Sequence, residues 1–110
     1  QPIYPCIWFN NNEAQSGAAF YCGIFPNARI LAQNPVVTTF EIGGSRFMAL
    51  NGGPNGGPQF KPTEAISFVV TCDTQEEIDR YWDALTADGG AEGQCGWLKD
   101  KYGVSWQMVP

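Results

Sequence analysis

The most reactive side chains in this chain of 110 residues are those of four cysteines: Cys6, Cys22, Cys72 and Cys95. No two of them form a C-x-x-C pair, and their spacing does not fit a zinc site. Cys6 and Cys72 lie in apolar, strand-like surroundings, where a free thiol behaves as a small hydrophobic side chain. We therefore expect four reduced thiols in a cytosolic protein. A disulfide scaffold is the less favoured alternative.

Histidine is absent from the sequence. Its absence excludes Ser-His-Asp and Cys-His catalysis and removes the commonest metal ligand in proteins. Cys6 has no evident base nearby to lower its pKa, so we expect an inert thiol rather than a nucleophile. Glu76 and Glu77 come at a predicted helix start, where their charges suit the helix dipole. The sequence therefore predicts no catalytic residue.

The segment NGGPNGGPQFKP, residues 51–62, could be a phosphate loop or a connection between two halves of a fold. A phosphate loop lies between a strand and the helix that it opens, so that backbone N–H groups face the anion. This segment leads into the strand AISFVV instead, and Pro54, Pro58 and Pro62 remove donors. We interpret it as a crossover, with an anion-binding nest as the less favoured alternative.

The overall charge narrows the range of partners. The net charge is −5, and only six residues are Lys or Arg. Nucleic acids and acidic membranes require clustered basic side chains, so neither is an expected partner. No apolar run approaches the roughly 18 residues of a membrane span. The N-terminal QPIYPCIWF lacks a basic leader and a cleavage site, so no signal peptide is expected.

The first half of the chain predicts a strand, a helix and three further strands. The expected ranges are residues 3–9, 12–25, 28–32, 36–42 and 45–50. We expect Asn12 to cap the helix, with Gln15 completing a capping box. The pair Gly43-Gly44 supplies the positive φ angles of a tight hairpin turn.

The second half repeats the order of a strand, a capped helix and further strands. The expected ranges are residues 65–71, 74–88, 92–99 and 104–109. Thr74 and Glu77 form a capping box at the helix start, and Asp100 begins a turn into Gly103. The tryptophans of this half are assigned to the core between helix and sheet: Trp82, Trp97 and Trp106. The shared order indicates a weak internal repeat of one supersecondary unit.

These elements predict an α+β fold of two βαβββ modules that form a curved mixed sheet with both helices on its convex side. Module 1 covers about residues 1–53, the crossover residues 54–62, and module 2 about residues 63–110. Neither module can bury its helix and sheet alone, so we expect the two to form a single domain spanning residues 1–110.

The motifs MALNGGP and WLKDKYGVSWQ, and nearly the whole chain around them, resemble the PhnB-like proteins. These belong to the vicinal oxygen chelate superfamily of glyoxalases, bleomycin-resistance proteins and extradiol dioxygenases. The family often carries the label 3-demethylubiquinone-9 3-methyltransferase. A SAM-dependent methyltransferase needs a larger α/β domain with a glycine-rich strand-to-helix turn, so we interpret the label as an inherited name.

The resemblance also implies where a site would lie. Enzymes of the superfamily hold a divalent metal with side chains of the first, fourth, fifth and eighth strands, and the matching positions here hold Cys6, Ala49, Ala65 and Gln107. Two alanines provide no donor atom, so neither a metal nor another cofactor is expected. A ligand cavity remains, and alternation along the strands predicts its lining. The predicted lining residues are Cys6, Trp8, Phe47, Ala49, Ala65, Ser67, Ser105 and Gln107.

Three functions stay open at this point. The preferred one is metal-independent binding of a small molecule. The alternatives are an enzyme of the superfamily with an unidentified reaction, and a structural or interaction protein in which the predicted lining packs against itself or a second subunit. Superfamily members commonly pair, and open strand edges favour pairing. We therefore expect a cytoplasmic, bacterial-type homodimer that binds neither nucleic acid nor membrane.

Overall fold

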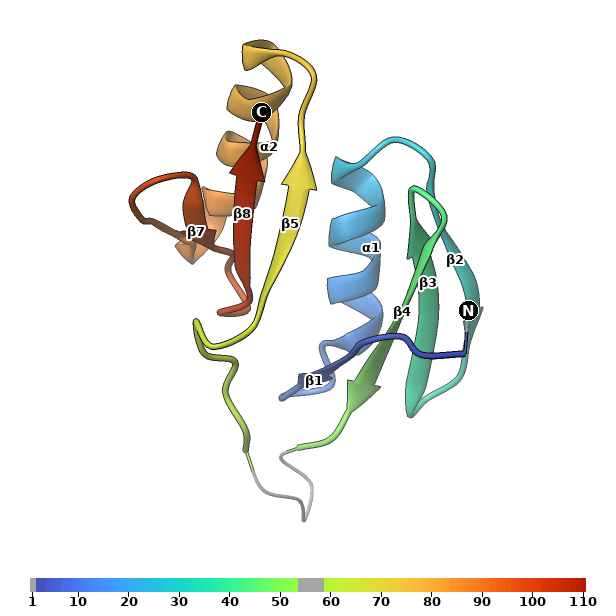
Figure 1. Ribbon diagram of the computed structural model, residues 1–110. Helices are drawn as coiled ribbons and strands as arrows, with labels where there is room; N and C mark the ends of the chain where they lie inside the picture. The colour runs from blue at the N-terminus through green and yellow to red at the C-terminus, as the bar shows by residue number, and fades with distance from the viewer. Residues whose placement is uncertain (1, 54–58) are drawn as a thin grey trace. The chain divides into compact units, whose positions relative to one another are not determined.

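A computed structural model describes residues 2–53 and 59–110. The chain divides into two compact units, residues 1–60 and 61–110. Each unit contains a strand, a helix and three further strands. Figure 1 traces the chain through both units. The predicted fold class, α+β with two βαβββ modules, is therefore confirmed. Residues 54–58 of the predicted crossover lie outside the described residues.

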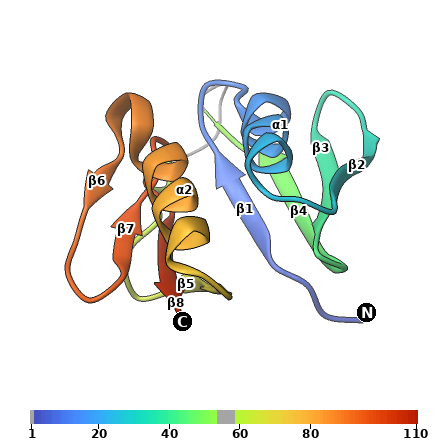
Figure 2. The ribbon, with the colours of Figure 1, turned by 90° about the horizontal axis from the view of Figure 1, so that it is seen from above.

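The first unit is a four-stranded mixed sheet with a helix on one face (Figure 2). Its elements are β1 (Cys6–Phe9), α1 (Ala14–Ile24), β2 (Ala28–Gln33), β3 (Val37–Ile42) and β4 (Ser45–Asn51). The strand order is β1-β4-β3-β2. β1 runs parallel to β4, and the other neighbouring pairs are antiparallel. The hairpin turn between β3 and β4 uses Gly43 and Gly44 at φ 55° and 86°, as the sequence predicts.

The core of this unit lies between α1 and the sheet and consists largely of aromatic rings. Tyr21 of α1 stacks on Phe40 with ring centroids 6.0 Å apart, and Phe40 stacks on Phe47 at 5.3 Å. The helix comes closest to β1 at Gly17, where an added Cβ would lie 2.5 Å from the ring of Phe9. A glycine at this position is therefore required for the observed packing.

The start of α1 is held by a residue distant in sequence. The helix begins at Ala14, and its N-cap residue Glu13 makes no side-chain capping bond. Instead, Oδ1 of Asn51, at the end of β4, accepts a 2.8 Å hydrogen bond from the N–H of Ala14. The predicted cap at Asn12 is wrong, because the N-cap position is occupied by Glu13, and Asn12 has a left-handed backbone at φ 58°.

The second unit repeats this topology. Its elements are β5 (Ser67–Thr71), α2 (Gln75–Thr86), the 3₁₀ helix η1 (Ala87–Gly89), β6 (Ala91–Glu92), β7 (Trp97–Lys99) and β8 (Ser105–Val109). The strand order is β5-β8-β7-β6, and β5 runs parallel to β8. The single strand predicted at residues 92–99 is wrong, because Cys95 and Gly96 adopt positive φ and turn the chain back between β6 and β7.

The core of the second unit lies between α2 and one face of its sheet. The most deeply buried apolar residues here are Cys72, Tyr81, Leu85, Leu98, Val104, Trp106 and Met108. α2 begins as predicted, since Thr74 Oγ1 accepts a 3.1 Å hydrogen bond from the N–H of Glu77. The predicted turn after β7 is also present, with the N–H of Gly103 bonded to the carbonyl of Asp100 at 2.9 Å.

None of the helices in the described part of the chain has the length and apolar composition needed to cross a membrane.

Candidate ligand-binding site

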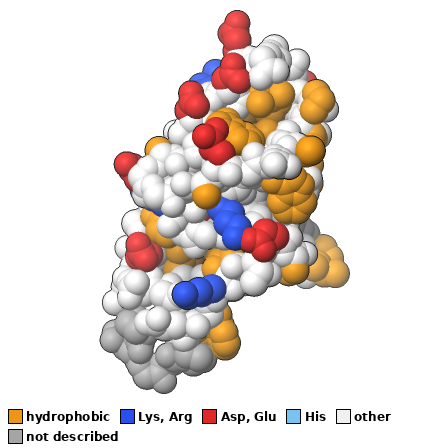
Figure 3. All heavy atoms as spheres, turned by 90° about the vertical axis from the view of Figure 1, so that its left-hand side faces the viewer, with side chains coloured by type: hydrophobic (Ala, Val, Ile, Leu, Met, Phe, Trp, Pro, Cys, Tyr) orange, Lys and Arg blue, Asp and Glu red, His pale blue; other side chains and the backbone are white. Residues whose placement is uncertain are grey.

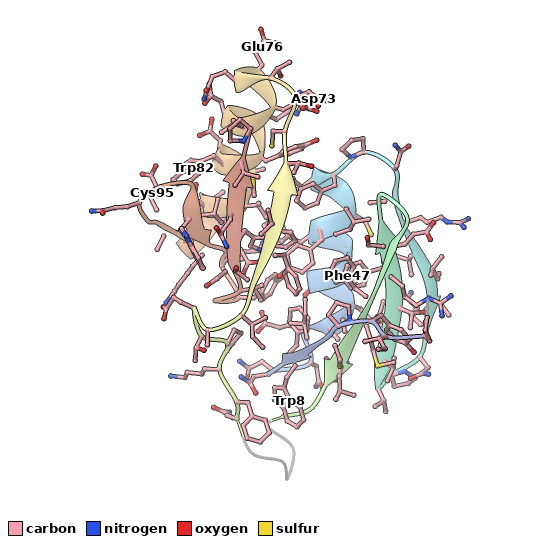
Figure 4. All side chains as sticks on the ribbon, viewed as in Figure 1. Trp8, Phe47, Asp73, Glu76, Trp82 and Cys95 are labelled. Atoms are coloured by element: carbon pink, nitrogen blue, oxygen red, sulfur yellow. The ribbon has the colours of Figure 1, made fainter. Side chains whose placement is uncertain are left out.

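The predicted lining residues of the first unit lie on opposite faces of its sheet. Because β1 pairs with β4 in parallel register, Cys6 lies beside Met48, and Trp8 lies beside Leu50 on the same face. Phe47 alternates with Met48 along β4 and therefore points to the other face, which α1 covers. Figure 4 shows Phe47 beside α1 and Trp8 at the end of β1.

Phe47 and Ala49 are therefore core residues, and the structure does not bring them together with Cys6 and Trp8. Ala49 is fully buried, and Phe47 stacks on Phe40 beneath the helix. Alternation along a strand shows which residues share a face, but only the docked helix decides which face is covered.

Three of the predicted residues of the second unit do meet on one face. Ser67 lies beside Ser105 in the register of β5 and β8, and Gln107 lies two residues further along β8. Nε2 of Gln107 donates a 2.8 Å hydrogen bond to Oγ of Ser67. The neighbouring Trp106 points to the opposite face and is buried in the core under α2. Ala65 precedes β5 in an exposed turn and is not a strand residue.

A cavity of about 310 Å³ lies in the second unit, along the β6–β7 hairpin. Its lining residues are Glu64, Ala91, Glu92, Gly93, Trp97, Leu98, Lys99 and Ser105. This volume is at the lower end of the roughly 300–1,000 Å³ range of small-molecule sites. Of the eight predicted lining residues, Ser105 borders this cavity.

Trp97 and Lys99 contribute the aromatic and cationic side chains of the cavity. In the register of β7 and β8, Trp97 lies beside Gln107 and Lys99 beside Ser105, so both share the face opposite α2. The sequence analysis placed Trp97 in the core, and this is wrong, because the residue between them, Leu98, occupies that position at 2% exposure. The alternation in WLK, read together with the predicted face of Ser105, could have identified both residues.

Lys99 forms an ion pair with Glu64, which also borders the cavity. The pKa of Glu64 is lowered, first by the side-chain hydrogen bond from Lys99, then by a hydrogen bond to the backbone of Glu64 itself, and then by the positive charge of Lys99. The two side chains are 42% and 61% exposed, respectively, so solvent screens the pair. Glu64 precedes β5 in a turn, whereas Lys99 belongs to β7.

Ser105 contributes a buried polar group without a partner. The residue is 1% exposed, and its hydroxyl makes no hydrogen bond among the described residues. A buried hydroxyl that lacks a partner costs about 1–3 kcal/mol.

The thiols are poorly suited to nucleophilic chemistry. The free cysteines are Cys6, Cys22, Cys72 and Cys95. Burial raises the pKa of Cys6 and Cys22. Burial also raises the pKa of Cys72, and the charges of Glu77 and Asp73 raise it further. Since the thiolate is the reactive form, these three groups are less reactive at neutral pH than an ordinary thiol.

The residues that the resemblance places at the superfamily metal positions do not fit a divalent cation. Ala49 and Ala65 have no donor atom, so these positions offer only the thiol of Cys6 and the amide oxygen of Gln107. Within residues 2–53 and 59–110, no three Cys, Asp or Glu side chains gather closely enough to hold an ion. An open catalytic site needs about three protein ligands, and the donor set here does not supply them.

The family model described as 3-demethylubiquinone-9 3-methyltransferase matches residues 1–109 of the chain. The chain belongs to this family. A PhnB protein from Bacillus cereus, described under the same methyltransferase designation, is similar to this family member at 30% identity with a TM-score of 0.79. The alignment covers 99% of this chain and 98% of the Bacillus cereus chain. No curated protein matches the sequence.

More distant solved structures share the fold of this family member. A glyoxalase/bleomycin resistance protein from Albidiferax ferrireducens T118 is 15% identical, with a TM-score of 0.63 and coverage of 98% of this chain and 97% of that one. A fosfomycin resistance protein from Listeria monocytogenes, solved with Mn(II) and sulfate, is also 15% identical, with a TM-score of 0.67 and coverage of 97% and 86%. The family member therefore has the glyoxalase/bleomycin resistance fold.

Proposed function

We propose that this PhnB-like chain binds a small organic molecule without a metal ion. The observation that carries the proposal is the cavity of about 310 Å³, which combines the aromatic wall of Trp97 with a buried hydroxyl, that of Ser105, for which the described residues supply no hydrogen-bond partner. An apolar wall with a few polar groups is typical of small-molecule sites. We interpret the methyltransferase name as an inherited label, because these 110 residues contain no glycine-rich strand-to-helix turn of the kind that a SAM-binding α/β domain uses.

The remaining part of the proposal is that the protein works in the cytoplasm as a homodimer and binds neither nucleic acid nor membrane. The surface charge supports the last two of these points. Acidic side chains gather in the upper part of the face seen in Figure 3, at the height of α2. α2 contains Glu76, Glu77, Asp79 and Asp83 but only one basic residue, Arg80. A surface of this charge repels phosphate groups.

The test is a thermal-shift screen with aromatic acids, amides and amines, followed by calorimetric titration of each compound that stabilises the protein. A ligand at 100 times its Kd should stabilise the chain by about 2.7 kcal/mol. We expect Ala91→Trp, which fills the cavity from the exposed strand β6, to abolish binding. Ala19→Trp, at an exposed position of α1, is the matched control and should leave binding unchanged.

Two results would overturn the proposal. Binding that survives Ala91→Trp would place the ligand elsewhere. Binding that disappears after dialysis against a chelator and returns with a divalent cation would show that a metal is required, and would favour an enzyme of the superfamily instead.

A further inference from the structure

The charged pair in the cavity joins a residue of a strand to a residue of an exposed turn. Lys99 belongs to β7 and is flanked by Leu98 and Asp100, each 2% exposed, so its backbone is held by the core. Glu64 lies in a turn outside the sheet, and its side chain is 61% exposed. An exposed ion pair adds little stability, so the carboxylate of Glu64 can return to water at small cost.

The distance between Trp97 and Lys99 sets the shape of a fitting ligand. The two residues are separated by one residue on the same face of β7, so their Cα atoms are roughly 6–7 Å apart. A ring that packs on the Trp97 indole would therefore place a directly attached acidic group within reach of the Lys99 ammonium. Ser105 lies beside Lys99 in the sheet, and its hydroxyl has no hydrogen-bond partner within the described residues.

We infer that the cavity takes a planar carboxylic acid, with its ring on Trp97 and its carboxylate on Lys99 in the place that Glu64 occupies in the free protein. Glu64 is then a built-in competitor of the ligand. The inference rests on the proposed function and specifies the ligand class of the same cavity.

A cationic ligand fits the same groups less well. It would have to separate Lys99 from Glu64 and leave the ammonium group unpaired beside the indole of Trp97. The carboxylate of Glu92 offers no alternative, because it is bound to the indole nitrogen of Trp82 at 2.6 Å. Leu98, its partner in the sheet register, faces the core. Glu92 therefore borders the cavity with its backbone.

The test uses three probes that share one ring system: 2-naphthoate, 2-naphthamide and 2-naphthylmethylammonium. A charge-assisted hydrogen bond should make the carboxylate bind about tenfold more tightly than the amide. Removing the competitor with Glu64→Gln should tighten naphthoate binding about threefold or more and leave the amide unchanged. Lys99→Met, which keeps the apolar stem, should reduce naphthoate to the affinity of the amide.

Lys101→Met is the matched control, because Lys101 lies in the turn after β7 and does not border the cavity. It should change none of the affinities. Circular dichroism of each variant confirms that the fold is retained.

Equal binding of naphthoate and naphthamide, or tighter binding of the ammonium probe, would overturn the carboxylate inference while leaving the proposed binding function intact. Weaker naphthoate binding by Glu64→Gln would overturn the role of Glu64 as competitor. If none of the three probes binds, the carboxylate inference fails. The proposed binding function is then tested separately, by the thermal-shift screen and the Ala91→Trp variant described above.

Discussion

The indole nitrogen of Trp106 donates a 2.9 Å hydrogen bond to Oδ2 of Asp100, and both side chains are buried. Oδ1 of the same carboxylate accepts from the backbone N–H groups of Tyr102 and Val104 at 2.8 and 3.1 Å. One carboxylate therefore organises the turn between β7 and β8. This turn fixes the register that places Lys99 beside Ser105 at the cavity.

Removal of this carboxylate should be strongly destabilising. Asp100→Ala leaves the indole N–H and two backbone N–H groups without their acceptor, so we expect a loss of about 3 kcal/mol in the free energy of unfolding. Urea denaturation followed by tryptophan fluorescence measures this change. Asp83→Ala, at an exposed site of α2, should change stability by less than about 0.5 kcal/mol. A similar effect of both variants would show that the Asp100 contacts are energetically unimportant.

Asn51 should act as the cap of α1 although it belongs to β4. Asn51→Ala removes the acceptor of the Ala14 N–H and the donor to the carbonyl of Pro35, and we expect a loss of about 1–2 kcal/mol. Asn12→Gly is the matched control: a glycine accepts the left-handed backbone there, so stability should stay within about 0.5 kcal/mol. If thermal denaturation instead shows the larger loss for Asn12→Gly, the helix is capped locally.

These two asparagines show what sequence reasoning could and could not supply. The order of elements was predictable, because alternation, the Thr74 cap and the Gly43-Gly44 turn act over a few residues. The cap of α1 was not predictable, because Asn51 reaches the helix only after β4 has paired with β1. The local pattern predicted a cap at Asn12, but the helix is capped by the tertiary hydrogen bond between Asn51 and the N–H of Ala14.

In the candidate site, too, the features set by local patterns were predictable and those set by tertiary contacts were not. Ser67, Ser105 and Gln107 were correctly placed on one face, because the parallel register of β5 and β8 preserves alternation. Phe47 was misplaced, because the face that α1 covers depends on helix docking and not on the strand itself. Glu64 was missed, since an exposed glutamate in a turn has no pattern that distinguishes it from a solvated charge.

Two glycines of α1 should respond to the same substitution in opposite directions. Gly17→Ala inserts a methyl group against the ring of Phe9, and overpacking of this kind costs about 1–3 kcal/mol. At Gly23 an added Cβ meets nothing within 4 Å, so Gly23→Ala should gain up to about 1 kcal/mol from helix propensity. Urea denaturation of the two variants measures both changes in the free energy of unfolding. Stabilisation by Gly17→Ala would contradict the close approach of α1 to β1.

The buried thiol of Cys72 should make stability depend on alkaline pH. Its pKa in the folded chain is raised above the ordinary value of 9.0, chiefly by burial. As pH rises, the unfolded chain therefore loses this proton before the folded chain does. The thiol makes its full contribution to the free energy of unfolding below about pH 9, and this contribution disappears as pH rises through the folded pKa. Cys72→Ala should reduce the loss of stability between pH 8 and about 10.5. Cys95→Ser, at an exposed position, should leave that loss unchanged, and equal pH profiles of wild type and Cys72→Ala would contradict the assignment.

The last prediction concerns self-association. β5 lies at the edge of its sheet and pairs with β8 alone in the described sheet, and its Val69 is 58% exposed. Ile66, just before the strand, is 74% exposed. An open edge with exposed aliphatic side chains favours pairing with a second copy, so we expect a two-fold homodimer that uses β5.

Light scattering at micromolar concentration should give twice the 12.0 kDa mass of one chain. Val69→Asp should shift the mass toward that of a monomer, because a carboxylate cannot be buried unpaired at such an interface. Val36→Asp is the matched control, since Val36 is also more than half exposed, at 54%, and precedes β3 in the first unit. A wild-type mass near 12.0 kDa would contradict the dimer, and dissociation by Val36→Asp alone would move the interface away from β5.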